Sequence, residues 1–164
     1  MTERIIEQAP PLIKPVSDLT EKAKAAIRDA FAGVTLGDGI GLGEARALDD
    51  YASNEVRAAF RANDEKSDWT AIAAEILNKH PSSPSFFDAE GMRFHLPAYL
   101  IADLDNLYEH EFVYHLCGPL EKFSLLTALQ RSAVELYLHA ICERKNTASY
   151  QYDVKRALEE WAAW

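Results

Sequence analysis

The stretch from Thr127 to Asn146, TALQRSAVELYLHAICERKN, does most to set the expected fold class. Thr127 is followed three residues later by Gln130, which matches the capping box that opens many α-helices. From residue 133 to residue 142 the chain is apolar on almost every side, as is typical of a helix buried at the centre of a protein. We therefore expect a mostly α-helical protein built around this segment.

Composition and periodicity extend this prediction to the rest of the chain. The 25 alanines outnumber the valines, isoleucines and threonines together, and alanine favours helix whereas β-branched residues favour strand. Apolar residues recur at helical steps near both ends, at Leu19, Ala23, Ala26, Ile27, Ala30 and Phe31 and again at Tyr150, Val154, Leu158 and Trp161. We expect six or seven helices in one domain over residues 17–164, preceded by a loosely ordered arm over residues 1–16.

The segment from Ser85 to Tyr99, SFFDAEGMRFHLPAY, departs from the helical pattern. Gly91 permits a turn, and Leu96 is biased towards an extended conformation because Pro97 follows it. Between these breaks apolar and polar side chains alternate, which places them on opposite sides of an extended chain. We therefore expect a short extended segment at residues 92–96, with a helix that begins at Pro97.

This segment also gathers side chains that carry chemistry. In an extended chain Arg93 and His95 share one side, and Asp88 and Glu90 lie just before the turn. In a functional interpretation His95 is an acid or base, Arg93 binds an anion and a carboxylate orients His95. In a structural interpretation Arg93 pairs with Asp88 or Glu90, and Asp88 caps backbone amides. We favour the structural interpretation, because ion-pair networks perturb charges as catalytic sites do.

A second cluster is acidic and follows this segment in DLDNLYEHEFVYH, residues 103–115. Its carboxylates are Asp103, Asp105, Glu109 and Glu111. A metal site is not predicted, because His110 and His115 are five residues apart and so point to different faces of a helix. The cluster is therefore either a solvated acidic face or a docking patch for a basic protein.

Charge and motif spacing argue against several classes of function. The formal net charge of −9 disfavours nucleic-acid binding, because the phosphate backbone would be repelled. The glycines between residues 37 and 43 do not follow the Gly-x-Gly-x-x-Gly spacing of a dinucleotide loop, so no cofactor is predicted. No apolar run is long enough to span a membrane. Cys117 and Cys142 lie in apolar contexts, are expected to be buried and inert, and fit a reducing cytoplasm.

Four stretches, in order along the chain, resemble the signature of a bacterial family of unknown function. They are GIGLGEARALDDYAS, DEKSDWTAI, SFFDAEGMRFHLPAYLIADL and LTALQRSAVELYL, and the most specific part is Gly-x-Arg-Phe-x-Leu-Pro-Ala-Tyr from Gly91 to Tyr99. The resemblance runs from about Phe31 to Leu138. It implies a recurring helical domain and assigns no catalytic residue.

These observations favour a cytoplasmic protein that binds another protein, as an accessory, inhibitor or immunity-like partner, over an enzyme. One alternative is a small hydrolase-like enzyme whose pocket contains Asp88, Glu90, Arg93 and His95. Another is a small domain that binds an anionic ligand through Arg93 and His95. The sequence predicts neither an oligomeric state nor the identity of the partner.

Overall fold

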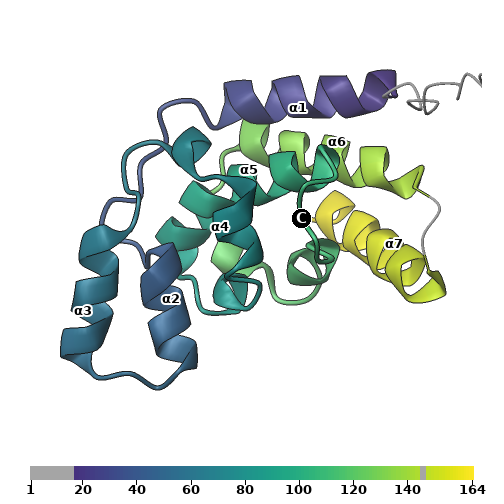
Figure 1. Ribbon diagram of the computed structural model, residues 1–164. Coiled ribbons are helices and arrows are strands. Elements are labelled where there is room, and N and C mark those ends of the chain that lie inside the picture. The colour runs from purple at the N-terminus through teal and green to yellow at the C-terminus, as the bar shows by residue number, and fades with distance from the viewer. Residues whose placement is uncertain (1–16, 145–146) are drawn as a thin grey trace, which may run out of the picture.

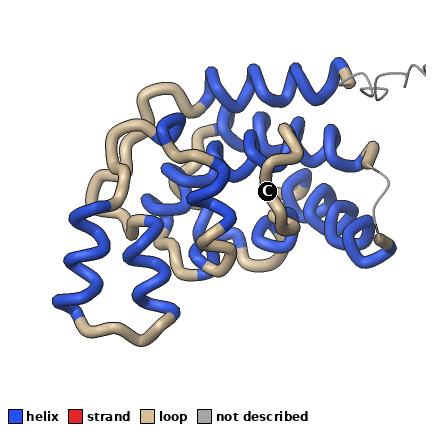
Figure 2. Tube along the Cα trace, viewed as in Figure 1, coloured by secondary structure: helices blue, strands red, loops and turns tan. Residues whose placement is uncertain are grey.

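The computed structural model describes residues 17–144 and 147–164, and this part of the chain is helical, with no strand (Figure 2). The α-helices are α1 (Asp18–Ala30), α2 (Leu42–Asp49), α3 (Asn54–Asn63), α4 (Ala74–Asn78), α5 (Ala89–Leu104), α6 (Ala128–Cys142) and α7 (Ala148–Ala162). Short 3₁₀ helices are η1 (Trp69–Ala71), η2 (Ser83–Ser85), η3 (Val113–Leu116) and η4 (Leu120–Phe123). The predicted fold class is confirmed, and the predicted arm at residues 1–16 lies outside the described residues.

Helix α6 begins at the predicted capping box. The Thr127 hydroxyl accepts a hydrogen bond from the Gln130 N–H at 3.2 Å, and the Gln130 side chain accepts one from the Thr127 N–H at 3.0 Å. The Gln130 amide also donates to the Ala30 carbonyl at the end of α1, 3.1 Å away. One short motif therefore both starts α6 and attaches α1 to it.

The core lies where α6 packs against α1, α7 and α5 (Figure 1). Val134, Tyr137, Leu138 and Ile141 are buried on α6, as the sequence predicts. Trp161 of α7 is buried as well, and its indole N–H donates to the Leu116 carbonyl at 2.9 Å. The prediction of two buried cysteines is wrong: Cys142 is exposed and Cys117 is half-buried, because Cys142 ends α6 on its outer side.

The prediction of an extended segment at residues 92–96 is wrong, because α5 runs without interruption from Ala89 to Leu104. Asp88 caps its first turn, and Pro97 lies inside the helix rather than at its start. A proline there deprives the Arg93 carbonyl of its usual N–H donor. Twelve of the sixteen residues of α5 are buried, and this packing outweighs the lost hydrogen bond.

Helices α2 and α3 form a hairpin that stands away from α1, α6 and α7 (Figure 1). Helix α3 packs against α2, and none of its ten residues is buried. We call residues 42–63 the hairpin and residues 49–56 its tip. Helix α3 thus contributes little to the core, whereas α2 buries Leu42, Gly43, Ala45 and Ala47.

Helices α2 and α5 end with the same hydrogen-bond pattern. After α2, Tyr51 has φ 55°, and the N–H groups of Ala52 and Tyr51 donate to the carbonyls of Ala47 and Leu48. After α5, Asn106 has φ 57° in the equivalent position, followed by Leu107. This is the Schellman motif, whose left-handed position usually holds glycine and sometimes asparagine. Asn106 fits that preference, whereas Tyr51 does not.

Candidate functional site

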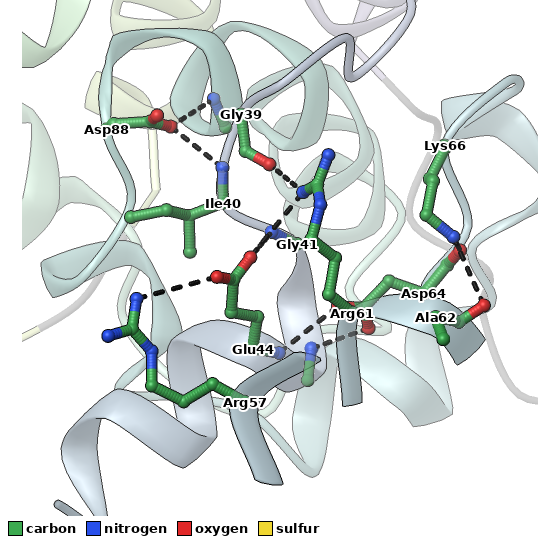
Figure 3. A network of polar contacts seen from close by, with 12 residues as sticks. Gly39, Ile40, Gly41, Glu44, Arg57, Arg61, Ala62, Asp64, Lys66 and Asp88 are labelled. Atoms are coloured by element: carbon green, nitrogen blue, oxygen red, sulfur yellow. Dashed lines mark hydrogen bonds and ion pairs between the residues drawn. The ribbon is translucent and has the colours of Figure 1, made fainter. Parts of the chain in front are cut away.

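The signature stretch begins α5 and holds the glycine-rich loop at residues 37–43 against it (Figure 3). The same Asp88 carboxylate oxygen accepts hydrogen bonds from the Gly91 N–H at 2.8 Å and the Ile40 N–H at 3.0 Å. The Asp88 side chain therefore acts as a helix cap and a loop anchor, as the structural interpretation expects.

Two glycines allow this close contact. A Cβ atom on Gly39 would lie 2.6 Å from the Gly91 nitrogen, and a Cβ atom on Gly91 would lie 2.5 Å from the Ile40 carbonyl oxygen. Both obstacles are backbone atoms, which cannot rotate away as a side chain can. The two motifs therefore meet backbone to backbone.

The start of α2 already holds an anion, supplied by the chain itself. One Asp64 carboxylate oxygen accepts from the Gly43 N–H at 2.7 Å and the other accepts from the Glu44 N–H at 3.1 Å. A helix N-terminus behind a glycine-rich loop is where a phosphate would bind. Because the Asp64 carboxylate already accepts from these N–H groups, they are not open to a phosphate, and the loop serves as a structural joint.

Arg61 completes the joint at the base of the hairpin (Figure 3). Its guanidinium donates to the carbonyls of Gly39 and Gly37, the latter at 2.8 Å. Arg57 and Arg61 each lie 3.5 Å from a Glu44 carboxylate oxygen. These contacts join both helices of the hairpin to the loop.

Arg93 does not make the predicted ion pair with Asp88 or Glu90 in the described part of the chain. Its side chain is half-buried, and its Nε is buried without a hydrogen-bond partner there. Glu90 instead packs on the glycine-rich loop. If Gly39 carried a Cβ atom, that atom would lie only 2.7 Å from the Glu90 Cβ. The Asp88 carboxylate is instead engaged by the N–H groups of Gly91 and Ile40, and because residues 92–96 are helical, Arg93 and His95 do not share one side as they would in an extended chain.

His95 is part of the core. It is 0 % exposed, stacks on Phe87 with ring centroids 4.4 Å apart, and meets Phe94 edge-on. Its Nδ1 lies 2.7 Å from the Gly91 carbonyl, so Nδ1 carries the hydrogen that it donates. Burial lowers the pKa of His95 to about 4, which keeps the ring neutral at pH 7. In this structure His95 is therefore a packed core residue and Asp88 is a helix cap.

Asp103 is buried and does not belong to an exposed acidic patch. Arg144 donates to both of its carboxylate oxygens at 3.1 Å, and the Tyr137 hydroxyl donates to one of them at 2.7 Å. Arg144 also donates to the Asp103 backbone carbonyl at 2.6 Å. Sequence reasoning missed Arg144 and Tyr137, because they lie 41 and 34 residues away and no local signal links them to Asp103.

The other members of the acidic cluster lie apart from Asp103. Asp105 pairs with Lys24 of α1 at 2.5 Å, which neutralises its charge. Glu109 and Glu111 are exposed on the loop after α5, and the Glu109 N–H donates to the Asn78 side chain at 2.9 Å. The exposed part of the predicted patch is therefore Glu109 and Glu111.

Three clefts open on the described surface, with volumes of about 230, 490 and 500 Å³. The first two share Arg28, Trp69 and Thr70. In each cleft a basic side chain lies alongside a carboxylate: Arg28 with Asp105, Arg28 with Asp68, and Lys122 and Arg156 with Glu121. None of these clefts therefore presents charges of a single sign to a ligand.

Cys117 lines the third of these clefts, together with Ser85. Burial raises the pKa of its thiol to about 11, so the thiol stays protonated at pH 7. Its sulfur lies 3.3 Å from the Asp153 carbonyl. The geometry makes Cys117 a packed thiol, since the thiolate is the reactive form.

The hairpin tip and α3 expose large apolar side chains. Tyr51 is 97 % exposed, and Val56 and Phe60 are 44 % and 45 % exposed. Val56 and Phe60 are four residues apart and so lie on one face of α3. A periodic stripe could have revealed this face in the sequence, but periodicity does not show whether another element covers it.

Within the described residues, no group of three or more His, Cys, Asp or Glu side chains is placed to hold a metal ion. A search of the same residues also found no helix with the length and apolar character needed to cross a bilayer.

Comparison with known proteins gave one match. The model of a protein family, described as "Family of unknown function (DUF6714)", matches residues 20–164. No curated protein and no solved structure matches the chain. The match covers the glycine-rich loop, the hairpin, α5 and the buried Asp103 cluster described above.

Proposed function

The chain belongs to this family of unknown function, and we propose from its structure that it acts by binding another protein. The observation that carries the proposal is helix α3, which buries none of its residues although it bears an apolar stripe. An amphipathic helix of a globular protein normally turns such a stripe to the core. Val56 and Phe60 remain about half exposed, with Phe60 partly covered by Gly43 of α2, and the exposed part of the stripe is available to a partner.

The hairpin has the features of a preformed docking element. Its base is held by Asp64, Arg61 and Glu44, so binding need not first order the helices. Its exposed residues include Tyr51, and tyrosine is one of the residue types that dominate binding energy in protein interfaces. Presentation of one helix face to a groove is a recurring mode of recognition.

We also propose what kind of protein the partner is and where in the cell the two meet. A net charge of −9 favours a basic partner in the cytoplasm of a bacterium, for which this chain serves as an accessory, inhibitor or immunity-like protein. Glu109 and Glu111 are exposed carboxylates that could add a second contact. We take Gly91 to Tyr99 as the signature of the family, and its first residue, Gly91, lies against the glycine-rich loop that the Asp88 cap anchors.

The test is affinity purification from lysate of the source organism with three versions of the chain. These are the wild type, a hairpin variant (Tyr51→Ser, Val56→Ser, Phe60→Ser) and a control with similar exposed residues replaced elsewhere (Leu129→Ser, Tyr152→Ser). A protein retained by the wild type and the control but lost from the hairpin variant supports the proposal, provided that all three unfold at similar temperatures. Equal retention by the folded hairpin variant contradicts it.

A further inference from the structure

The arginines of the hairpin are all paired within it. Arg46 lies 2.9 Å from Asp50, and Arg57 and Arg61 each lie 3.5 Å from Glu44. The three arginines of the hairpin are thus engaged by two of its four acids, Asp50 and Glu44, and Arg57 and Arg61 share the single Glu44 carboxylate.

Two carboxylates remain, and both are at the tip. Asp49 accepts a hydrogen bond from the Ser82 hydroxyl at 2.7 Å, and within the described chain neither Asp49 nor Glu55 pairs with a cation. Hydrogen bonds from its own backbone and from Ser53 lower the pKa of Glu55, so it stays ionised. Asp49 and Glu55 flank Tyr51 in the sequence, so both of these carboxylates lie within four residues of the most exposed aromatic residue of the tip.

The conformation of Tyr51 makes its presence there harder to explain by stability. Its φ of 55° is one that residues with a side chain rarely adopt, and glycine is the usual residue at this position of the motif. With 97 % of the residue exposed, the ring has almost no contact in this chain that could compensate. A strained residue without such compensation is a reason to look for a function.

From these observations we infer that the partner presents an apolar groove bordered by lysine or arginine side chains, and that Tyr51 is the residue that enters it. This inference rests on the proposed function, that the hairpin binds a protein, and adds the chemistry of the partner. The apolar groove receives Tyr51 with Val56 and Phe60, and the basic border faces Asp49 and Glu55.

Site-specific photo-crosslinking tests the inference. The photoreactive residue p-benzoylphenylalanine replaces Tyr51 in one protein and Leu129 in a control, because Leu129 is 64 % exposed on α6, away from the hairpin. Both are irradiated in lysate of the source organism at low and at high salt, and the crosslinked peptides are sequenced by mass spectrometry. The expected product, specific to position 51, is a peptide of another protein with apolar residues flanked by Lys or Arg, formed less at high salt.

The outcomes separate this inference from the proposed function. A position-51 adduct to a peptide without basic residues, or to a second copy of this chain, overturns the inference while leaving the hairpin as a binding surface. No adduct at position 51 above the Leu129 control overturns both.

A charge-reversal variant gives a second, quantitative readout with the crosslinked partner. Asp49→Lys with Glu55→Lys is expected to weaken binding at least about tenfold and to reduce its salt dependence. The control is Glu143→Lys with Glu159→Lys, which changes the net charge by the same amount. Glu143 is an exposed acid at the C-terminal end of α6, and Glu159 is an exposed acid of α7. Equal weakening by the two variants would show a general effect of net charge and would refute a basic border around Tyr51.

Discussion

Helix α5 buries twelve of its sixteen residues, whereas helix α3 buries none of its ten. The apolar residues of α5 face α1, α6 and the short helices around it, and even its histidine and one aspartate lie inside. Helix α3 keeps a Val and a Phe about half exposed on one face.

The comparison indicates that α5 and the hairpin have different roles in the molecule. In α5 Asp103 is matched by Arg144 and Tyr137, whereas Arg93 Nε and His95 Nε2 are buried without a hydrogen-bond partner in the described chain. In the hairpin the Arg46–Asp50 pair lies at the surface, and Tyr51 adopts a left-handed backbone conformation although its side chain is almost fully exposed. We therefore expect substitutions in α5 to change stability, and substitutions at the hairpin tip to change binding.

The largest effect is expected from the buried ion pair at the end of α5. Arg144→Met leaves the Asp103 carboxylate buried without its cation, which should lower the free energy of unfolding by about 3–5 kcal/mol. Arg46→Met breaks the exposed Arg46–Asp50 pair of the hairpin and should cost less than about 1 kcal/mol. Urea unfolding measures both, and equal losses would contradict the contrast between the regions.

A pH effect of nearly the same size is expected from His95. Its pKa is about 4 in the fold against 6.5 as the ordinary value, so between these pH values the unfolded chain binds a proton that the folded chain does not. The free energy of unfolding should therefore fall as pH drops from 6.5 to 4, by about 3 kcal/mol for this group.

The variant His95→Phe separates this contribution from others. Burial also lowers the pKa of His115 to about 4 and lowers the pKa of His80, so the wild-type slope contains all three histidines. Urea unfolding at several pH values should show a shallower pH dependence for His95→Phe, and the difference from wild type isolates His95. An unchanged slope would mean that His95 does not titrate differently in the fold.

A smaller effect, of opposite sign, is expected at the tip of the hairpin. Tyr51→Gly relieves a left-handed conformation that costs residues other than glycine about 1–2 kcal/mol. Glycine loses more conformational entropy on folding, which offsets part of this gain, so the protein should be stabilised by about 0.5–1 kcal/mol. Asn106→Gly, at the equivalent position after α5, should have a smaller effect, since asparagine tolerates this conformation. The unfolding temperatures of the two variants and the wild type measure these effects. A lower unfolding temperature for Tyr51→Gly would show that the Tyr51 ring stabilises the fold.

The smallest effect is expected on the exposed face of α3. Val56→Ser removes an apolar side chain that is already half in water, so the free energy of unfolding should change by no more than about 0.5 kcal/mol. The same variant should weaken binding of the partner captured through the hairpin. A loss of stability above 1 kcal/mol would place Val56 in the core of the hairpin instead.

The sequence alone predicted the helical class because capping and periodicity are local. The Thr127–Gln130 capping box and the apolar stripes of α1 and α7 each depend on residues close together in the sequence, and all three are present in the structure. The sequence predicts the part of α5 from Pro97 onward but not its first half, because a helix buried on nearly all sides has no polar face and its period is hidden. Gly91 and Pro97 then looked like breaks in the chain, although burial overrides both.

The candidate residues were only partly predictable because their partners are distant. Capping by Asp88 is a short-range pattern and was foreseen as one of two interpretations. The pairing of Asp103 with Arg144 spans 41 residues and depends on how α5 and α6 pack. The exposure of Tyr51 depends on the projection of the hairpin from the body, which no local pattern shows.

The backbone contact between Gly39 and Gly91 has a consequence for how this chain can change over evolutionary time. Each glycine leaves no room for a Cβ because the other motif's backbone lies against it. Neither position can be rescued by trimming the other, since both residues already lack a side chain. We therefore expect relatives to keep or lose the two glycines together, so that the loop before α2 and the start of α5 are inherited as a single unit.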